Sequence, residues 1–207
     1  MKNITPFIFC AGKGTRLRPL TYKTPKPLLP LGDSSMLEIN LKRLTNDGFE
    51  KIYVSFSYRK DLFEKVVQKF KGPTSVALVE DSKVSGQVGT LRNNLDLFSE
   101  NETLLCFNGD TFIKFAEDNF LNLKNLPLDN ALVFGSRGVK RLPRELLCKD
   151  GELKGAVLNG KKYIYIKTEK SLENNIGMYL LPKDLIRSVE ETEGFLGFFG
   201  ENDLFDI

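Results

Sequence analysis

The sequence predicts an α/β protein with a mostly parallel sheet flanked by helices and a second half rich in hairpins. Short apolar runs alternate with stretches of helical periodicity up to about residue 110, and the runs are apolar throughout. Alternating strands and helices favour parallel pairing, because a crossover helix returns the chain to the same edge of the sheet. Continuously apolar strands are typical of sheets covered on both faces. We therefore predict a Rossmann-like first half.

The elements of the first half follow from the spacing of apolar residues. Strands are expected at ITPFIF (4–9), KIYVSFSY (51–58), SVALVED (75–81) and TLLCFNGD (103–110). Helices are expected at 36–48, 60–70 and 91–98. In the first of these helices Leu37, Leu41 and Leu44 recur near helical spacing, and Gly48 supplies a stop signal.

The second half changes character after an apolar run at 131–137. Between residues 146 and 170, one Asp-Gly and one Asn-Gly dipeptide separate strand-like pieces, which is typical of antiparallel hairpins. A further strand is expected at 175–182, and a helix at 183–191. Because no linker, repeat or low-complexity tract interrupts the chain, we expect a single domain over residues 1–207.

Composition narrows the possible chemistry. Thirty Lys and Arg residues against 27 Asp and Glu leave a net charge of +3, which favours neither nucleic acid nor an anionic membrane as a partner. The chain has no histidine, which removes the usual general base and most zinc sites. No apolar run approaches the roughly 18 residues that a membrane span needs. Three cysteines without metal-binding spacing fit a reducing compartment, so we expect a cytoplasmic protein.

The stretch CAGKGTRLRPLTYKTPKPLLP, residues 10–30, directly follows the first strand and holds two glycines, four prolines and five cations. Ligands of open α/β sheets bind at the carboxyl ends of the strands, which is where this loop begins. Glycines there let backbone N–H groups approach a phosphate. The spacing is not that of a P-loop, because Gly14 follows Lys13, nor that of G-x-G-x-x-G, because Leu17 takes the third glycine position.

The complete string is more specific than its glycines. AGKGTRLRPLTYKTPKPLLPL resembles the signature of the sugar-phosphate nucleotidyltransferases, also called nucleotide-sugar pyrophosphorylases, in which G-x-G-T-R-L-x-P-L-T precedes P-K-P-L. Four further stretches match family motifs in the same order: GQVGTLRNNL, FNGDTF, EKSLENNIGMYLL and the terminal LFDI. The resemblance extends over nearly the whole chain and implies a nucleotide-binding half at about 1–115 and a sugar-phosphate-binding half at about 116–207.

The resemblance also implies a reaction. Enzymes of this family join a nucleoside triphosphate (NTP) to a sugar 1-phosphate and release pyrophosphate, by in-line attack of the sugar phosphate oxygen on the α-phosphorus. Both reactants are already anionic, so the protein must supply positioning and positive charge rather than a general base. The absence of histidine is then no obstacle.

Residue roles follow from the matched motifs. Arg16 would clamp the β- and γ-phosphates, Lys26 would reach the α-phosphate, and Asp110 would hold Mg²⁺ at the end of its strand. The nucleotide would be bound by Ala11, Gly12, Gly14, Thr15, Glu80, Gly86, Gln87 and Gly89. The sugar phosphate would be bound by Asn108, Gly109, Glu169, Lys170, Asn175 and Gly177. Arg18 is expected to be a solvated or packing cation.

The sequence departs from the family pattern at several positions. Asp206 would be the second magnesium ligand, but the sequence stops at Ile207, where the family motif W-x-D-I-G-T-P continues, so we expect a truncated carboxyl end. Gln87 replaces a small hydroxyl residue, and Thr90 replaces an alanine. Ser171 stands in place of a proline. The resemblance therefore assigns neither the nucleobase nor the sugar.

Three functions remain open. Guanylyl transfer to a heptose or hexose 1-phosphate, supplying nucleotide sugars for cell-surface polysaccharides, is our first choice, because the chain is as short as the compact family members. A cytidylyltransferase acting on phosphocholine is the second, and an aromatic cage for choline could draw on Tyr179, Phe195, Phe198 and Phe199. A non-catalytic nucleotide-binding regulator is the third, and the intact phosphate-binding residues argue against it.

Overall fold

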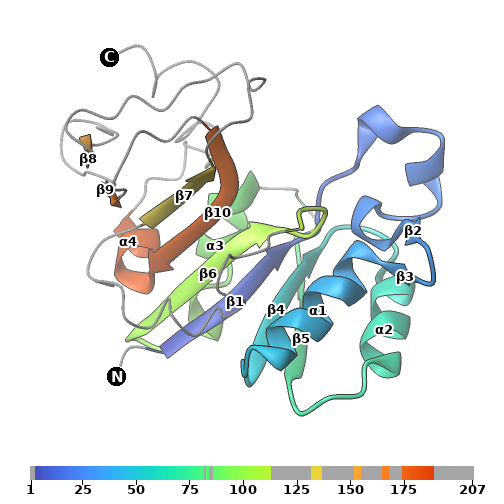
Figure 1. The fold of residues 1–207 in the computed structure, drawn as a ribbon, viewed down its shortest axis with the longest axis horizontal. Helices are drawn as coiled ribbons and strands as arrows, with labels where there is room; N and C mark the ends of the chain where they lie inside the picture. Colours follow the sequence, from blue (N-terminus) through green and yellow to red (C-terminus); the bar gives the residue numbers. More distant parts are fainter. Residues whose placement is uncertain are drawn as a thin grey trace. The chain divides into compact units, whose positions relative to one another are not determined.

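The computed structural model of the chain describes residues 3–81, 83, 86–112, 132–136, 152–154, 165–167 and 174–188. The backbone divides into two compact units, both drawn in Figure 1. The first unit comprises Ile4–Val84 and Cys106–Leu126. The second unit comprises Met1–Asn3, Ser85–Leu105 and Pro127–Ile207.

The first unit is built on parallel strands. Its strands follow the order β5-β4-β1, with β1 at Asn3–Phe9, β4 at Lys51–Phe56 and β5 at Ser75–Glu80. The next strand of the sheet is β6 (Glu102–Asn108), which belongs to the first unit only from Cys106 on. β4 pairs in parallel with β1 on one side and with β5 on the other. All residues of β4 after Lys51 are buried, as expected for a strand covered on both faces. The predicted fold class, a mostly parallel sheet flanked by helices, is confirmed.

Two helices accompany these strands, α1 at Met36–Asn46 and α2 at Lys60–Lys69. α1 begins with a capping box, in which the Ser35 hydroxyl accepts the Glu38 N–H and the Glu38 carboxylate accepts the Ser35 N–H. Its buried face includes Leu37, Leu41 and Leu44, as the helical spacing predicted. α2 contacts β5. Both helices lie within one residue or two of their predicted bounds.

A long loop connects β1 to α1 and consists of short turns. Three 3-10 turns, η1 to η3, lie at Thr15–Leu17, Leu20–Tyr22 and Lys26–Leu28. A small antiparallel pair follows, with β2 at Pro30–Leu31 and β3 at Ser34–Ser35. We call residues 10–29 the β1 loop, which rises beyond the carboxyl end of β1 in Figure 1.

The second unit has antiparallel strands, as predicted for the second half. β10 (Asn174–Pro182) is hydrogen-bonded to β6. On its other side β10 pairs with β7 (Leu132–Ser136) in antiparallel register. β8 (Glu152–Lys154) and β9 (Tyr165–Lys167) form a separate antiparallel pair. The last described helix, α4, spans Lys183–Ser188.

The helix predicted at 91–98 has the wrong bounds. α3 begins earlier and spans Gly86–Arg92, and a separate 3-10 turn, η4, follows at Leu95–Leu97. The Asn94 side-chain amide donates to the Thr90 carbonyl at 2.8 Å, so it takes up an acceptor that a continuing α-helix would use. Apolar spacing continues across this interruption, which is why the sequence pattern did not show it.

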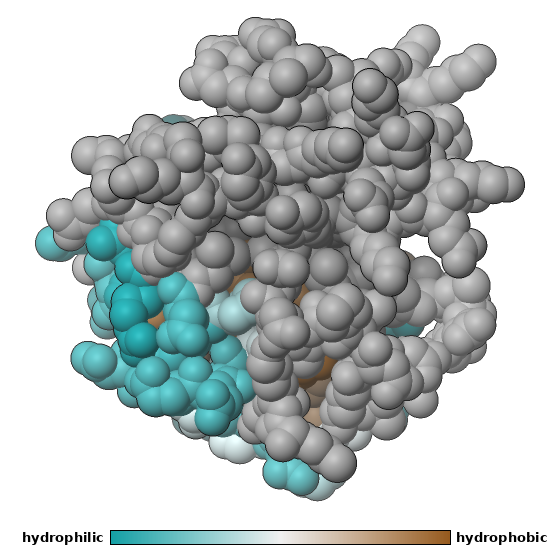
Figure 2. Space-filling model, turned by 90° about the vertical axis from the view of Figure 1, so that its left-hand side faces the viewer, coloured by the Kyte–Doolittle hydropathy of each residue, from teal (hydrophilic) through white to brown (hydrophobic). Residues whose placement is uncertain are grey.

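Apolar side chains of the strands and helices form the buried core. Cys10 and Cys106 are free and buried, so they pack as small apolar side chains. On the face drawn in Figure 2, the described surface is mostly hydrophilic. Among the described residues, no helix is both long and apolar enough to cross a membrane.

Candidate active site

The β1 loop leaves the sheet beside the end of β6. The Gly109 N–H donates to the Phe9 carbonyl at 2.9 Å, which ties the turn after β6 to the last residue of β1. Asn108, Gly109 and Asp110 therefore lie at the edge of the sheet from which the β1 loop departs. This is the edge at which open α/β sheets bind their ligands.

Two of the predicted catalytic residues meet at this edge. Lys26, at the start of η3, forms an ion pair with the Asp110 carboxylate. The two side chains are 40% and 29% exposed, so a ligand can reach both. An ion pair between partly exposed groups contributes at most about 1 kcal/mol to folding, so exchanging one partner for a phosphate or a cation costs little.

The turn that carries Asp110 is fixed by close packing. A Cβ on Gly109 would lie 2.3 Å from Cys10 Sγ, so only glycine fits at this position. Asn40, buried on α1, donates its side-chain amide to the Thr111 carbonyl at 3.1 Å and to the Gly109 carbonyl at 3.5 Å. Asn40 thus holds the turn on both sides of Asp110, although no sequence pattern marked it as part of the site.

Cys10 lies next to the site without taking part in its chemistry. Burial raises the pKa of the Cys10 thiol well above its usual range, and the nearby Asp110 carboxylate adds to the rise. A thiol in this state stays protonated and is a poor nucleophile. The Cys10 side chain therefore serves to fill the space against Gly109.

The two glycines of the β1 loop have different surroundings. Gly14 has a φ of +60°, and a Cβ there would lie 2.9 Å from Thr21 Cγ2, so the fold itself requires glycine. The Thr21 hydroxyl donates to the Gly14 carbonyl at 2.8 Å. A Cβ on Gly12 would meet no atom within 4 Å, and its φ is not in the left-handed region. The fold does not require Gly12, whereas a ligand lying against the backbone would.

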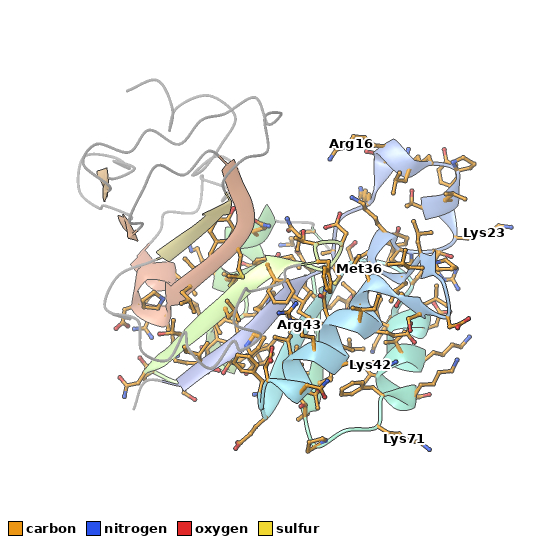
Figure 3. The ribbon with its side chains drawn as sticks, viewed as in Figure 1. Arg16, Lys23, Met36, Lys42, Arg43 and Lys71 are labelled. Atoms are coloured by element: carbon orange, nitrogen blue, oxygen red, sulfur yellow. The ribbon has the colours of Figure 1, made fainter. Side chains whose placement is uncertain are left out.

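Two cations of the loop point outward. Figure 3 shows Arg16 and Lys23 projecting from different sides of the loop, and both are exposed. Arg18 lies over the ring of Tyr22 at 5.0 Å from its centroid, which agrees with the packing role expected for it. Of the other predicted nucleotide ligands on the loop, Ala11 is buried and Thr15 is exposed.

Residues that the sequence analysis did not single out hold the β1 loop in place. The strand predicted to reach residue 58 ends at Phe56, and the next residues turn toward the loop. Three consecutive side chains donate to loop carbonyls: Ser57 to Ala11, Tyr58 to Thr21, and Arg59 to Lys23. The available signal was their position, since polar residues that follow a parallel strand lie at the ligand-binding edge.

The remaining predicted site residues lie elsewhere in the chain. Glu80 is the last residue of β5 and is exposed. Gly86, Gln87 and Gly89 lie in α3 of the second unit. Asn175 and Gly177 lie on β10, where Asn175 pairs with Gly135 of β7. Glu169, Lys170 and Asp206 lie outside the described residues.

A comparison of the chain with known protein families shows to which family it belongs. The family described as nucleotidyl transferase matches residues 5–130, which is more than half of the chain. The chain belongs to the nucleotidyl transferase family. The matched region includes most of β1, the β1 loop and the turn with Asp110, so it covers the candidate site in the first unit. The predicted family is confirmed.

Curated relatives of this nucleotidyl transferase carry several different names. The chain is 28% identical to the bifunctional protein GlmU of Methanocaldococcus jannaschii, over 96% of this chain and 44% of that protein. It is 27% identical to a UTP–glucose-1-phosphate uridylyltransferase of Synechocystis, over 86% and 49%. It is 26% identical to the D-glycero-alpha-D-manno-heptose 1-phosphate guanylyltransferase of Campylobacter jejuni, over 94% and 84%. The chain thus spans less than half of the first two relatives.

Solved structures share the fold at lower identity. HddC from Yersinia pseudotuberculosis, complexed with GMP-PN, matches with a TM-score of 0.69 and 20% identity, over 92% of this chain and 82% of that one. The CTP:phosphocholine cytidylyltransferase of Streptococcus pneumoniae matches with a TM-score of 0.59 and 17% identity, over 86% and 71%. At these identities the likeness shows the fold alone.

Proposed function

We propose that this member of the nucleotidyl transferase family joins an NTP to a sugar 1-phosphate and releases pyrophosphate. The observation that carries the proposal is the arrangement at the edge of the first unit. There the β1 loop contains both Gly12, beside which there is open space, and Lys26, which forms an ion pair with Asp110. Backbone amides, a cation and a carboxylate are the groups that a triphosphate with its metal ion requires. Two relatives named for glucose 1-phosphate and heptose 1-phosphate support a sugar phosphate as the acceptor.

The residues of the β1 loop would supply positioning and positive charge. Backbone amides at Gly12 and Gly14 would hold the nucleotide phosphates, and the exposed Arg16 would bind the β- and γ-phosphates through its planar fork. Lys26 would turn to the α-phosphate when a ligand replaces it beside Asp110. The sugar phosphate oxygen then attacks the α-phosphorus, and pyrophosphate leaves with the electrons of the broken P–O bond. No proton has to be removed, because the attacking oxygen is already anionic.

The Asp110 carboxylate has the properties of a magnesium ligand. Mg²⁺ keeps several waters and takes only one or two protein carboxylates beside phosphate oxygens, so a single accessible carboxylate at a strand end is sufficient. In the described part of the chain, no three His, Cys, Asp or Glu side chains gather into a metal cage of the protein alone. Bound Mg²⁺ would neutralise part of the phosphate charge. Asp206, which we propose as the second ligand, lies outside the described residues.

Within this reaction class we propose guanylyl transfer to a heptose or hexose 1-phosphate, as a step toward nucleotide sugars for cell-surface polysaccharides. The Campylobacter jejuni guanylyltransferase supports this choice, because the match extends over most of both chains. We place the reaction in the cytoplasm, where free thiols such as Cys10 and Cys106 stay reduced.

A substrate panel tests the proposal. Purified protein is incubated with each of the four NTPs and dTTP, each paired with heptose, mannose, glucose and N-acetylglucosamine 1-phosphates or with phosphocholine, and pyrophosphate release is followed with and without Mg²⁺. We expect magnesium-dependent release that needs both an NTP and a sugar 1-phosphate and is fastest with GTP. Release with CTP and phosphocholine alone would favour the cytidylyltransferase. Nucleotide binding without release from any pair would favour a regulator.

A further inference from the structure

The turn between β4 and α2 has an unusual backbone. Arg59, the residue before α2, has a φ of +53° and a ψ of +45°, which is the left-handed region that side chains other than glycine and asparagine rarely adopt. Its side chain makes no capping hydrogen bond to the helix that it precedes. A capping contact to α2 therefore does not explain an arginine in this conformation.

The side chains of this turn give a reason that is not local. The Ser57 hydroxyl donates to the Ala11 carbonyl, the Tyr58 hydroxyl to the Thr21 carbonyl at 3.0 Å, and the Arg59 Nη1 to the Lys23 carbonyl. We call Ser57, Tyr58 and Arg59 the clasp. It meets the β1 loop near its start and again just before Lys26, which lies three residues after Lys23.

Arg59 is itself held by a second contact. Its Nε and Nη2 donate to the two carboxylate oxygens of Asp61, each at 2.9 Å, which leaves Nη1 directed at Lys23. The hydrogen bond from Arg59 lowers the pKa of Asp61, so this carboxylate stays charged. A guanidinium can make both contacts at once because its donors form a rigid fork, whereas a lysine ammonium cannot reproduce that geometry.

The β1 loop needs such an anchor because its own charges repel. Residues 10–30 include five Lys and Arg residues and no Asp or Glu. A loop of this kind is ordered only where something else fixes it, and each residue left to be ordered on ligand binding weakens that binding. Fastening the loop in advance therefore favours the nucleotide-bound arrangement.

We propose that Arg59 is a positioning residue, which fixes the β1 loop through the Lys23 carbonyl so that Arg16 and Lys26 are in place for the triphosphate. This inference rests on the proposed function for its effect on turnover. Its structural part, the fastening of the loop, does not depend on the substrate.

The test compares three substitutions at this contact with one matched control. Arg59→Asn removes the guanidinium but keeps a residue that tolerates the left-handed backbone. Arg59→Lys keeps the charge without the fork, and Asp61→Asn weakens the contact that orients Arg59. Lys60→Gln, in the exposed Lys60–Glu64 pair, changes a neighbouring charge whose ion pair lies within α2.

Two measurements separate positioning from general stabilisation. Trypsin can cut the β1 loop after Lys13, Arg16 and Lys23, whereas Arg18 and Lys26 precede proline. We expect Arg59→Asn to raise cleavage at these three sites about 10-fold, by local opening, while the thermal unfolding midpoint stays close to that of the parent. In the pyrophosphate assay we expect kcat to fall about 10-fold to 100-fold and KM for the NTP to rise, with KM for the sugar phosphate unchanged.

The other variants sharpen the assignment. Arg59→Lys should restore part of the protection, Asp61→Asn should give a smaller change in the same direction, and combining Asp61→Asn with Arg59→Asn should add nothing further. Lys60→Gln should match the parent. Unchanged loop cleavage in a folded Arg59→Asn protein would overturn the proposal, and so would a lower unfolding midpoint with faster cleavage throughout the chain. If the parent released no pyrophosphate from any pair, the proposed function would fail, and the loop-cleavage result would still decide whether Arg59 fastens the loop.

Discussion

Two lysine-carboxylate contacts, one in each unit, have the same chemistry in different surroundings. Lys26 pairs with Asp110 in the first unit, and both side chains are partly exposed. Lys183 in the second unit is only 6% exposed and donates both to the Phe98 carbonyl and to Glu100. The buried ammonium of Lys183 thus has two acceptors within the protein. The ammonium of Lys26 is exposed enough for a ligand to reach it.

The neighbouring charges differ as well. Glu100 also accepts from Arg187 through both of its oxygens, and Arg187 in turn binds Asp184, so positive and negative groups alternate. Lys26 belongs to a loop with five cations and no acidic residue, and Asp110 joins it from another strand end. A balanced network holds α4 to the residues before β6, while an excess of cations favours an anionic ligand. The surroundings of an ion pair therefore indicate its role better than the pair itself.

The largest expected effect is that of Asp110→Asn. Removal of the carboxylate that we propose as a magnesium ligand would take away several kcal/mol of charge stabilisation, so magnesium-dependent turnover should fall on the order of 1,000-fold or more. The unfolding midpoint should change little, because the lost ion pair is partly exposed. Magnesium titrations of pyrophosphate release, together with thermal unfolding, would measure both. Turnover within tenfold of the parent would remove Asp110 from the metal site.

Arg16→Ala should have the next largest effect. The loss of one electrostatic contact to charge that develops in the transition state typically costs about 100-fold or more in kcat. The matched control is Arg18→Ala, which removes an exposed cation of the same loop that stacks on Tyr22. Steady-state kinetics should show a loss in kcat for Arg16→Ala that Arg18→Ala does not share. Equal losses in the two variants would mean that the loop acts through its total charge.

In the second unit, Lys183→Met should lower the stability of the fold and leave kcat unchanged. The substitution keeps an unbranched apolar stem but removes the ammonium from a buried contact with the Phe98 carbonyl, which should cost about 1 to 3 kcal/mol in the free energy of unfolding. Lys60→Met, at an exposed ion pair, should cost less than about 0.5 kcal/mol. Denaturant unfolding and kcat would be measured for both variants. A loss of kcat in folded Lys183→Met protein would contradict the contrast between the two lysines.

The smallest expected effect is a pH dependence at Glu100. Hydrogen bonds from Lys183, and next from Arg187, lower the pKa of Glu100 from its ordinary value of 4.5. A carboxyl whose pKa is lower in the folded state favours folding above the unfolded value, and this contribution is lost as the pH falls through the lowered value. The difference in unfolding free energy between the parent and Glu100→Gln should therefore be constant above about pH 6 and shrink below pH 4.5. A difference independent of pH down to pH 3 would show that the charge of Glu100 contributes nothing.

The sequence by itself determined the parallel strands, the position of the cation-rich loop after β1 and the family. Each of these is recorded in neighbouring residues: apolar runs that must be buried on both faces, a glycine such as Gly14 that the backbone requires, and cations placed directly after a strand. The spacing of leucines on α1 is likewise a local property. Local rules failed at α3, because the Asn94 side chain competes for a backbone carbonyl and leaves no trace in the apolar pattern.

Only the tertiary structure decided which side chains meet. The pairing of Lys26 with Asp110, the hold of Asn40 on the turn after β6, and the reach of the clasp to the β1 loop all join residues far apart in the sequence. They depend on β1 lying between β4 and β6, which brings the three strand ends to one edge. Sequence periodicity shows that a strand is buried but not which strand lies beside it, because apolar faces of similar composition can pair in more than one order. Directional contacts such as that of Arg59 with Lys23 exist only after that order is set.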